Sequence, residues 1–530
     1  MKRAPTSTDS ICRDFFTASA DQFPIVSASD EFYYFPQVRP QKRDWSNWDT
    51  FSENSVNSFA RRLTDYENAL EVYGHLYENS IRQDLETRID LSFLKRTITT
   101  LREQLTEVRT WERQPTFHLT IACLGIAEAL ASDDASAGDA RAKTLPAFID
   151  SAVNSLKNMP VLFRDLGLRM LPQTRQYLSS LVPRLPNLKD ALPRLDALEK
   201  YLREAKTQSN FRVPENLVEK IIRNHLNCDL DIASIQSILD SEIRDMQAVL
   251  NRHAVAVSKD TSWQAMIENM PLPKVPAQGL VALYREQVLQ LAEHCLTSGL
   301  LSEDAFAGCP VQVLPVPAFL SAIRTASSYS IQPDYPPTGG IFYVINADNP
   351  AESRKAYQRE FRILSAHETY PGHHFLDSAR LHHNRPLRRC IERPVFYEGW
   401  ACFAEQLMRL TGYLDNEQEH MLLARRRLWR AMRGKVDLGL QTGSLDFEHA
   451  IKYLMKTGIN KDDAVSVVRK YPLNPGYQLC YTLGFKRFSN LFKTFGRNNL
   501  TGFVRQAVSQ GEIDFRDLEQ LMAIKIPSSG

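Results

Sequence analysis

Histidines concentrate in one short window of the sequence. The chain has twelve histidines in 530 residues, and five of them fall between positions 367 and 383. His367 is followed directly by Glu368, and His373 and His374 come a few residues later. Imidazoles at short spacing are typical zinc ligands, and a glutamate beside the first histidine can act as a general base towards a metal-bound water. We therefore expect metal-dependent chemistry in this window.

The spacing departs from the usual His-Glu-x-x-His signature, in which two imidazoles lie one turn apart on a helix. The fourth position after His367 is Pro371, which interrupts a helix, and Gly372 lets the chain deviate further. In an unbroken helix His373 would point away from His367, while His374 would share its face about 10 Å along the axis. A break at this point would return one of the two to the metal. We favour His373, and spacing alone leaves His374 open.

A catalytic zinc site needs a third protein ligand and keeps the fourth position for water. Glu398 and Glu405 are seven residues apart on one face of an expected helix with apolar flanks, so each carboxylate needs a partner. We expect Glu398 to be the third ligand and Glu405 to support a ligating histidine. Two histidines and one carboxylate also bind iron in non-haem oxygenases, so Fe²⁺ is the alternative to one Zn²⁺ per chain.

Composition restricts the class of protein that carries this site. The apolar share of 43% and the charged share of 24% are those of a globular protein. Sixty-four basic and sixty-two acidic residues give a net charge of +2, which offers no electrostatic argument for binding nucleic acid or a membrane. No secretory signal or spanning run is read, and the eight scattered cysteines lack a CxxC pair. We expect a cytoplasmic protein; its oligomeric state is not indicated.

The elements that must position the site are mostly helical. We expect an irregular N-terminal arm over residues 1–55, a helical lobe over 56–308, and a catalytic lobe over 309–530. Two β-like runs, at 311–317 and 340–346, predict a small sheet beside the active-site helix. The fold class is therefore mostly α, with two lobes and one small sheet.

The second β-like run also suggests where a substrate would bind. It begins at Gly340 and contains Tyr343, and such a strand can pair with an extended substrate backbone. Tyr335 lies shortly before it and, like Tyr343, offers a phenolic hydrogen-bond donor. We therefore expect Tyr335, Gly340 and Tyr343 to contact substrate.

Three segments resemble the DUF885 family, which is related to the glutamate-zinc (gluzincin) metallopeptidases. They are His-Glu-Thr-Tyr-Pro-Gly-His-His from position 367, Phe-Tyr-Glu-Gly-Trp-Ala from position 396, and the Pro-Gly-x-x-x-x-Tyr-x-x-Gly pattern from position 475. The resemblance covers roughly residues 310–500. It departs at residues 375–377, which read Phe-Leu-Asp where family members often carry a glutamine, and this affects the surroundings of the substrate more than metal binding.

The resemblance implies a mostly helical, cleft-bearing, metallopeptidase-like fold with zinc at its centre. It implies that His367, His373 and Glu398 are the metal ligands and that Glu368 is the general base. Tyr481 becomes a candidate hydrogen-bond donor to the developing oxyanion.

The main hypothesis is a zinc-dependent hydrolase that acts on a peptide or another small amide substrate. A tailoring enzyme of small-molecule metabolism with the same two-histidine, one-carboxylate site is the second hypothesis, and a non-catalytic cleft-binding protein is the third. Metal identity and oxygen dependence separate the first two.

Overall fold

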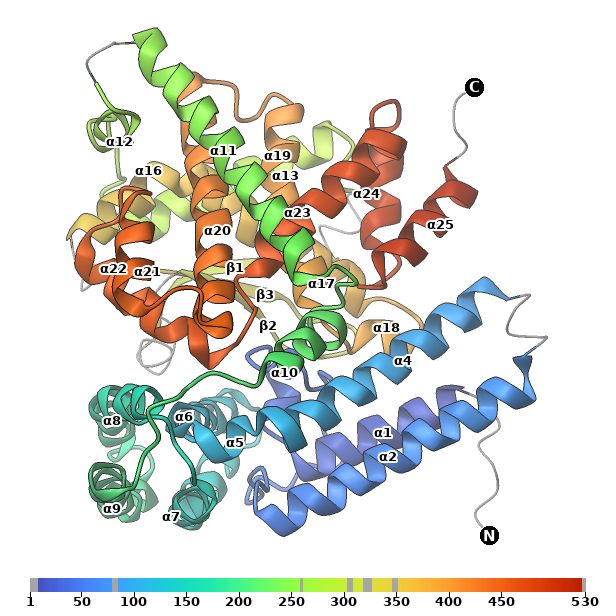
Figure 1. Cartoon of the computed structure of the whole chain (residues 1–530). Coiled ribbons are helices and arrows are strands. Elements are labelled where there is room, and N and C mark those ends of the chain that lie inside the picture. The colour runs from blue at the N-terminus through green and yellow to red at the C-terminus, as the bar shows by residue number, and fades with distance from the viewer. Residues whose placement is uncertain are drawn as a thin grey trace.

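The structure is a computed structural model that describes residues 8–78, 84–257, 261–302, 308–317, 327–345 and 351–526. It is mostly helical, with one three-stranded sheet (Figure 1). The N-terminal helices, drawn blue to teal in Figure 1, are α1 (Thr8–Gln22), η1 (Val26–Ala28), α2 (Glu53–Leu76), α4 (Leu85–Glu103), the π-helical η2 (Gln104–Val108), α5 (Thr110–Arg113), α6 (Pro115–Ala131), α7 (Ala137–Ser155), α8 (Val161–Leu181), η3 (Pro186–Asp190) and α9 (Leu192–Glu204).

The remaining elements, drawn green to red, include the helices that carry the histidine-rich window. They are α10 (Glu215–Lys220), η4 (Ile221–His225), α11 (Ile232–Val257), α12 (Trp263–Glu268), α13 (Leu280–Thr297), β1 (Val311–Pro315), β2 (Ser328–Ile331), β3 (Gly340–Val344), α16 (Ala351–Glu368), α17 (His373–Leu381), α18 (Pro386–Arg389), α19 (Pro394–Leu410), α20 (Glu417–Thr442), α21 (Phe447–Met455), α22 (Lys461–Lys470), η5 (Tyr471–Leu473), α23 (Leu479–Leu491), η6 (Phe492–Gly496), α24 (Leu500–Val508) and α25 (Phe515–Lys525).

Two large hydrophobic clusters hold these elements together. One is built mainly from residues 11–202 and the other mainly from residues 213–526. Most members of the first cluster precede residue 203 and most members of the second follow residue 212, while the expected lobes 56–308 and 309–530 stay a prediction. The clusters interlock, because α18 packs on the first one and Ile89 of α4 packs in the second.

Amphipathic spacing explains the N-terminal elements. The stripe Leu94, Ile98, Leu101 is fully buried along α4, as a repeat of three and four residues requires. The stretch expected to be an irregular arm contains the helix α1. Phe15 and Phe16 lie on its buried face, so apolar contact with the first cluster stabilises a helix there.

The sheet has the order β1-β3-β2, with β1 parallel and β2 antiparallel to β3. β3 is therefore the central strand, and both of its edges are already hydrogen-bonded. This corrects the expectation that the run from Gly340 through Tyr343 pairs with a substrate backbone, since a strand with two partners has no free edge. β2 is an outer strand of this sheet, and the sequence analysis did not predict it.

Helices α19 and α23 meet backbone to backbone. A Cβ atom on Gly399 would lie 2.4 Å from Cα of Gly484, so a side chain at this position has no room. The contact fixes the position of Glu398, which precedes Gly399, relative to the tyrosines near the start of α23.

We predict that Gly399→Ala lowers the free energy of unfolding by about 3 kcal/mol, because two helix backbones must separate to admit one methyl group. Gly74→Ala is the matched control: it is also helical, and its Cβ would meet only Leu91 Cδ2 at 3.8 Å, so it should be neutral or slightly stabilising. Urea denaturation of both variants measures the difference. Equal stability of the two would show that the α19–α23 contact can relax.

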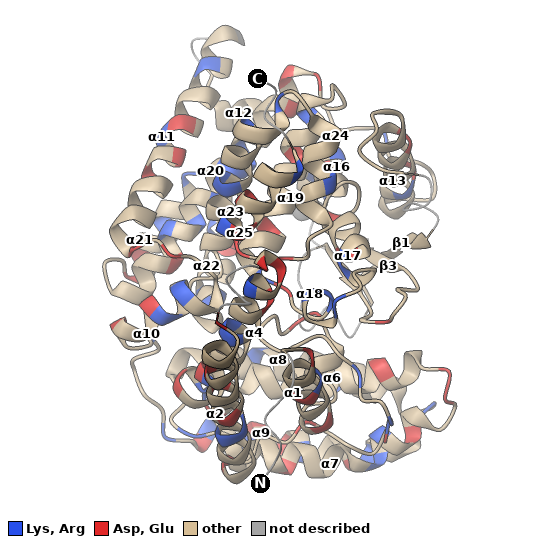
Figure 2. Ribbon diagram, turned by 90° about the vertical axis from the view of Figure 1, so that its right-hand side faces the viewer, with Lys and Arg blue, Asp and Glu red and all other residues tan. Residues whose placement is uncertain are grey.

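Basic and acidic residues are interspersed along the outer helices and do not separate by sign (Figure 2). Within the described ranges, no helix combines the length and the apolar character needed to cross a membrane.

Candidate metal centre

The turn after α16 brings His373 back to His367. Helix α16 ends at Glu368 and α17 starts at His373, so the proline–glycine pair ends one helix completely. A Cβ atom on Gly372 would lie 1.9 Å from the His367 carbonyl oxygen, and only glycine permits this close return. The Trp400 indole Nε1–H of α19 donates to the Pro371 carbonyl at 2.8 Å and holds the turn in place. As a result, the His367 and His373 rings lie 4.8 Å apart between centroids, at 81°.

Glu398 completes a cluster with these two histidines. Its Oε2 lies 3.7 Å from His367 Nε2 and 3.6 Å from His373 Nε2, and the three ligand atoms are all within 4.8 Å of one another. Ligands around a tetrahedral zinc ion are about 3.4 Å apart, so these separations fit such an ion. Glu398 Oε2 is buried and has no hydrogen-bond partner among the residues that the structure describes, as expected of an atom whose partner is a cation. Burial opposes ionisation of Glu398, but the two histidines outweigh it and hold the pKa of this carboxyl well below its ordinary value.

Glu405 supports His367 from behind. Its Oε1 lies 3.1 Å from His367 Nδ1, and Arg430 of α20 donates to both carboxylate oxygens at 2.7 Å. Burial opposes ionisation, yet Arg430 and then Arg426 hold the pKa of Glu405 well below its ordinary value. A carboxylate at Nδ1 favours the tautomer that turns the Nε2 lone pair towards the cluster. Arg430, which sequence reasoning missed, thus keeps Glu405 charged and in position.

His374 is turned away from the cluster. Its Nε2 lies 2.8 Å from the Cys309 carbonyl oxygen, and its Nδ1 lies 3.1 Å from the Tyr329 hydroxyl. Burial lowers the pKa of His374 to about 4, which keeps the ring neutral, with Nε2–H donating and Nδ1 accepting. The choice between His373 and His374 that spacing left open therefore falls on His373. Gly340 is explained by the same contact, since a Cβ there would lie 2.8 Å from His374 Nδ1.

Glu368 is buried beside the cluster at the end of α16. Its Oε2 accepts the backbone N–H of Tyr329 at 3.0 Å, so the outer edge of β2 orients this carboxylate. The Tyr329 hydroxyl contacts His374, and one residue of β2 thereby positions two side chains of the histidine window. No pattern in the sequence singled out Tyr329.

Two tyrosines from the third family-like segment lie at Glu398. Tyr477 donates its hydroxyl to Glu398 Oε1 at 2.8 Å, and Tyr481 lies beside the same carboxylate. Burial and then Glu398 raise the pKa of Tyr481 well above its ordinary value, so the hydroxyl remains a donor. The sequence singled out Tyr481 as a candidate hydrogen-bond donor, and that role stays a prediction; it did not single out Tyr477 of the same segment.

Tyr335 and Tyr343, which were also predicted to contact substrate, lie in different surroundings. Tyr335 is 58% exposed, and its ring packs under the Arg389 guanidinium at 3.9 Å, so the structure does not bring it to the cluster. Tyr343 is half-buried on the central strand opposite Ser328.

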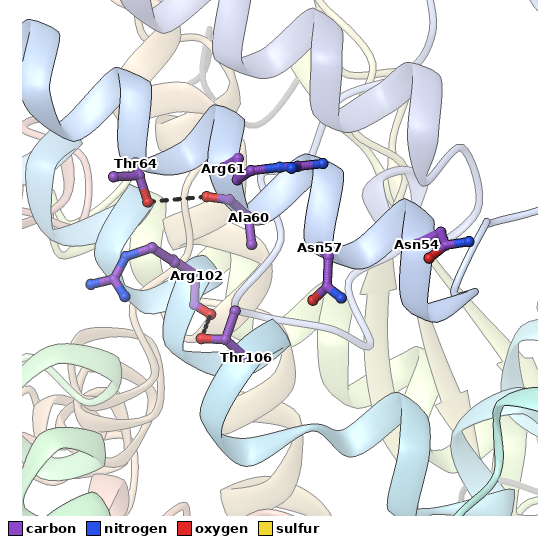
Figure 3. A pocket seen from close by; sticks show the side chains of 7 residues that line it. All are labelled: Asn54, Asn57, Ala60, Arg61, Thr64, Arg102 and Thr106. Carbon is purple, nitrogen blue, oxygen red and sulfur yellow. Dashed lines mark hydrogen bonds between the residues drawn. The ribbon is translucent and has the colours of Figure 1, made fainter.

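A separate polar cavity of about 640 Å³ lies in the groove between α2 and α4 (Figure 3). It contains no histidine, cysteine or carboxylate, and it shares no residue with the metal cluster. Its lining residues are Asn54, Asn57, Ala60, Arg61, Thr64, Arg102 and Thr106.

Comparison with known proteins finds a family that matches most of the chain. The family model described as "Bacterial protein of unknown function (DUF885)" matches residues 46–522. A candidate lipoprotein from Colwellia psychrerythraea has a similar structure, with a TM-score of 0.76, 17% identity, and coverage of 98% of this chain and 99% of that one. A candidate lipoprotein of unknown function from Shewanella oneidensis aligns with a TM-score of 0.74, 16% identity, and coverage of 98% and 100%. No curated protein matches the chain. At these identities the two structures establish a shared fold.

Proposed function

The chain belongs to the DUF885 family, and from the geometry of its histidine–glutamate cluster we propose that it is a zinc-dependent hydrolase of peptide or small amide bonds. The observation that carries the proposal is the convergence of two imidazole nitrogens and one carboxylate oxygen from three helices. Three protein ligands, rather than four, distinguish catalytic zinc sites from structural ones. His367, His373 and Glu398 are the proposed ligands.

A zinc ion held by His367, His373 and Glu398 would supply Lewis acidity and would lower the pKa of the attacking water towards about 7. Glu368 follows a ligand directly in the chain and takes the proton of the attacking water, then returns it to the leaving nitrogen. The Tyr481 hydroxyl, kept protonated by its surroundings, donates to the oxygen of the reacting carbonyl. In the net reaction water adds across the C–N bond and yields an acid and an amine.

The metal content of the purified protein tests this proposal first. We expect elemental analysis to find about one zinc per chain, and we expect hydrolysis of peptides or amides to stop on chelation and return with added Zn²⁺. The chelated protein in the same assay is the control. Stoichiometric iron with oxygen-dependent turnover would replace the hydrolase with an oxygenase, and a chain that neither holds nor reloads metal would contradict both.

We also propose a cytoplasmic location. All eight cysteines are buried and unpaired, which suits a reducing compartment. Fractionation of cells that express the full chain tests this. Recovery with the membrane fraction would contradict it, and the description of the two structural relatives as candidate lipoproteins makes this control necessary.

A further inference from the structure

Arg433 on α20 forms no ion pair with any residue that the structure describes. The residue is only 8% exposed, and its Nε is buried without a hydrogen-bond partner. In the part of the chain that the structure describes, no carboxylate forms an ion pair with its guanidinium. The other four arginines of α20 all have such a partner: Arg425 with Glu360, Arg426 with Glu360 and Glu405, Arg427 with Glu242, and Arg430 with Glu405.

Two aromatic rings hold the Arg433 side chain in place. The guanidinium carbon lies 3.6 Å from the centroid of the Tyr481 ring and 4.2 Å from that of Trp429. Stacking offsets part of the cost of burying a cation, but it uses none of the in-plane N–H donors. A buried guanidinium with free donors is therefore preorganised to bind a planar anion through two parallel hydrogen bonds.

Further polar atoms around Arg433 are also unsatisfied. Among the described residues, the Trp429 indole Nε1 and the Tyr471 hydroxyl have no hydrogen-bond partner; both atoms are buried and both can donate. Asp437, one turn further along α20, is the acid that faces this region. Its Oδ2 accepts the Gln478 N–H at 3.0 Å, and its Oδ1 is buried with no hydrogen-bond partner among the described residues. Three orphaned donor atoms, on Arg433, Trp429 and Tyr471, thus face one orphaned carboxylate oxygen, and this excess of donors points to an incoming acceptor.

Tyr481 connects this pocket of donors to the metal cluster. Arg433 covers one face of the Tyr481 ring, and the Tyr481 hydroxyl lies beside Glu398. An anion bound at Arg433 would therefore lie within one side-chain length of the proposed ligand Glu398.

We propose that Arg433 binds a carboxylate of the substrate, so that the enzyme acts on short peptides or N-acyl amino acids whose carboxylate lies close to the bond that is cleaved. This inference rests on the proposed hydrolase function. The carboxylate can come from the C-terminus of the substrate or from an acidic side chain next to the cleaved bond. Both sources present the same planar anion to the guanidinium.

Binding measurements with matched peptides test the proposal. The probes are three sets of N-acetylated dipeptides: one with a free C-terminus, one amidated, and one amidated with aspartate or glutamate as a side chain. Calorimetry on the zinc-loaded Glu368→Gln protein measures affinity without turnover. We expect carboxylate-bearing probes to bind about 100-fold more tightly than neutral amides, as is typical of a desolvated charge pair. Preference for the first set identifies a terminal carboxylate, and preference for the third identifies a side chain.

Variants of α20 assign the effect to Arg433. In the same background, Arg433→Met should abolish the preference while keeping the packing between the two rings, and Arg433→Lys should retain about a tenth of it because the ammonium lacks the fork. Arg427→Met is the control, since this arginine of the same helix pairs with Glu242 and should leave the preference unchanged. Thermal unfolding checks that each variant is folded.

The outcomes separate this inference from the proposed function. Zinc-dependent hydrolysis of amidated and free peptides at equal rates would overturn the role of Arg433 and leave the hydrolase standing. Carboxylate-selective binding that depends on Arg433, without hydrolysis by the zinc-loaded wild type, would support the role of Arg433 and contradict the proposed hydrolase. A preference that survives Arg433→Met, or an absence of binding by all three sets, overturns the inference.

Discussion

Replacement of His367 by alanine is expected to abolish stoichiometric zinc binding without unfolding the chain. His367 would supply one of three ligand atoms, and loss of one should weaken zinc binding at least about 1000-fold, given the ~10–16 kcal/mol typical of protein zinc sites. The fold should survive because Glu405 keeps its ion pairs with Arg430 and Arg426, so no buried carboxylate loses all of its partners. Elemental analysis after dialysis, and competition with a chromophoric chelator, measure the change.

Two further variants test the assignment of the zinc ligands. His374→Gln changes the neighbouring buried histidine, whose ring nitrogens both have protein partners, so it should leave the zinc content unchanged while lowering stability. Glu405→Gln removes the charge behind His367 and should weaken zinc binding about 10- to 100-fold. Zinc retained by His367→Ala, or lost in His374→Gln, would show that the ligand set is wrong.

The helical class and two of the strands could be predicted because they depend on local patterns. The stripe along α4 and the apolar runs at β1 and β3 are continuous signals of burial. β2 is only four residues, Ser-Tyr-Ser-Ile, and its pairing with β3 supplies what its own pattern does not. Helix α1 was missed because aromatic residues and prolines further along residues 1–55 masked its short apolar face.

The candidate ligands of the metal cluster could be found from the sequence, but spacing could not decide which of His373 and His374 joins the cluster. His373 is chosen over His374 by a turn that Gly372 permits and Trp400 holds, and the latter is 29 residues from its partner. His374 is held by Cys309, 65 residues away in the sequence. Such contacts have no periodicity, so spacing arguments do not detect them.

The same limit explains the supporting side chains that were missed. The basic run at 424–430 resembles an ordinary solvated helix face, yet Arg430 at its end is 3% exposed and binds Glu405. Arg433, one turn later, is separated from that run and is identified only by the partner it lacks. In both cases the role is indicated by whether a buried arginine has an acidic partner. Packing of α20 against α19 and α23 determines this.

Glu368→Gln is expected to retain zinc and stability but to lose turnover by about 1000-fold. Glutamine has the shape of glutamate, and its carbonyl oxygen still accepts the Tyr329 N–H that Glu368 Oε2 accepts at 3.0 Å. It cannot take up the proton of the attacking water, and loss of a positioned general base typically costs 10²–10⁴-fold. Initial rates on an amide that the zinc-loaded wild type hydrolyses measure the loss, with zinc content determined on the same samples.

A second acid on α16 provides the matched control for this result. Glu360 lies two turns before Glu368 and pairs with Arg425 and Arg426, so Glu360→Gln removes a carboxylate from the same helix without touching the zinc ligands. Its rate should stay within a few-fold of the wild type. Normal turnover in Glu368→Gln would assign proton transfer to another group, while loss of zinc from that variant would make Glu368 a support of the metal. A selective loss of rate at unchanged zinc content separates a base that acts on water from a carboxylate that only stabilises the site, because only the base is needed after the metal is in place.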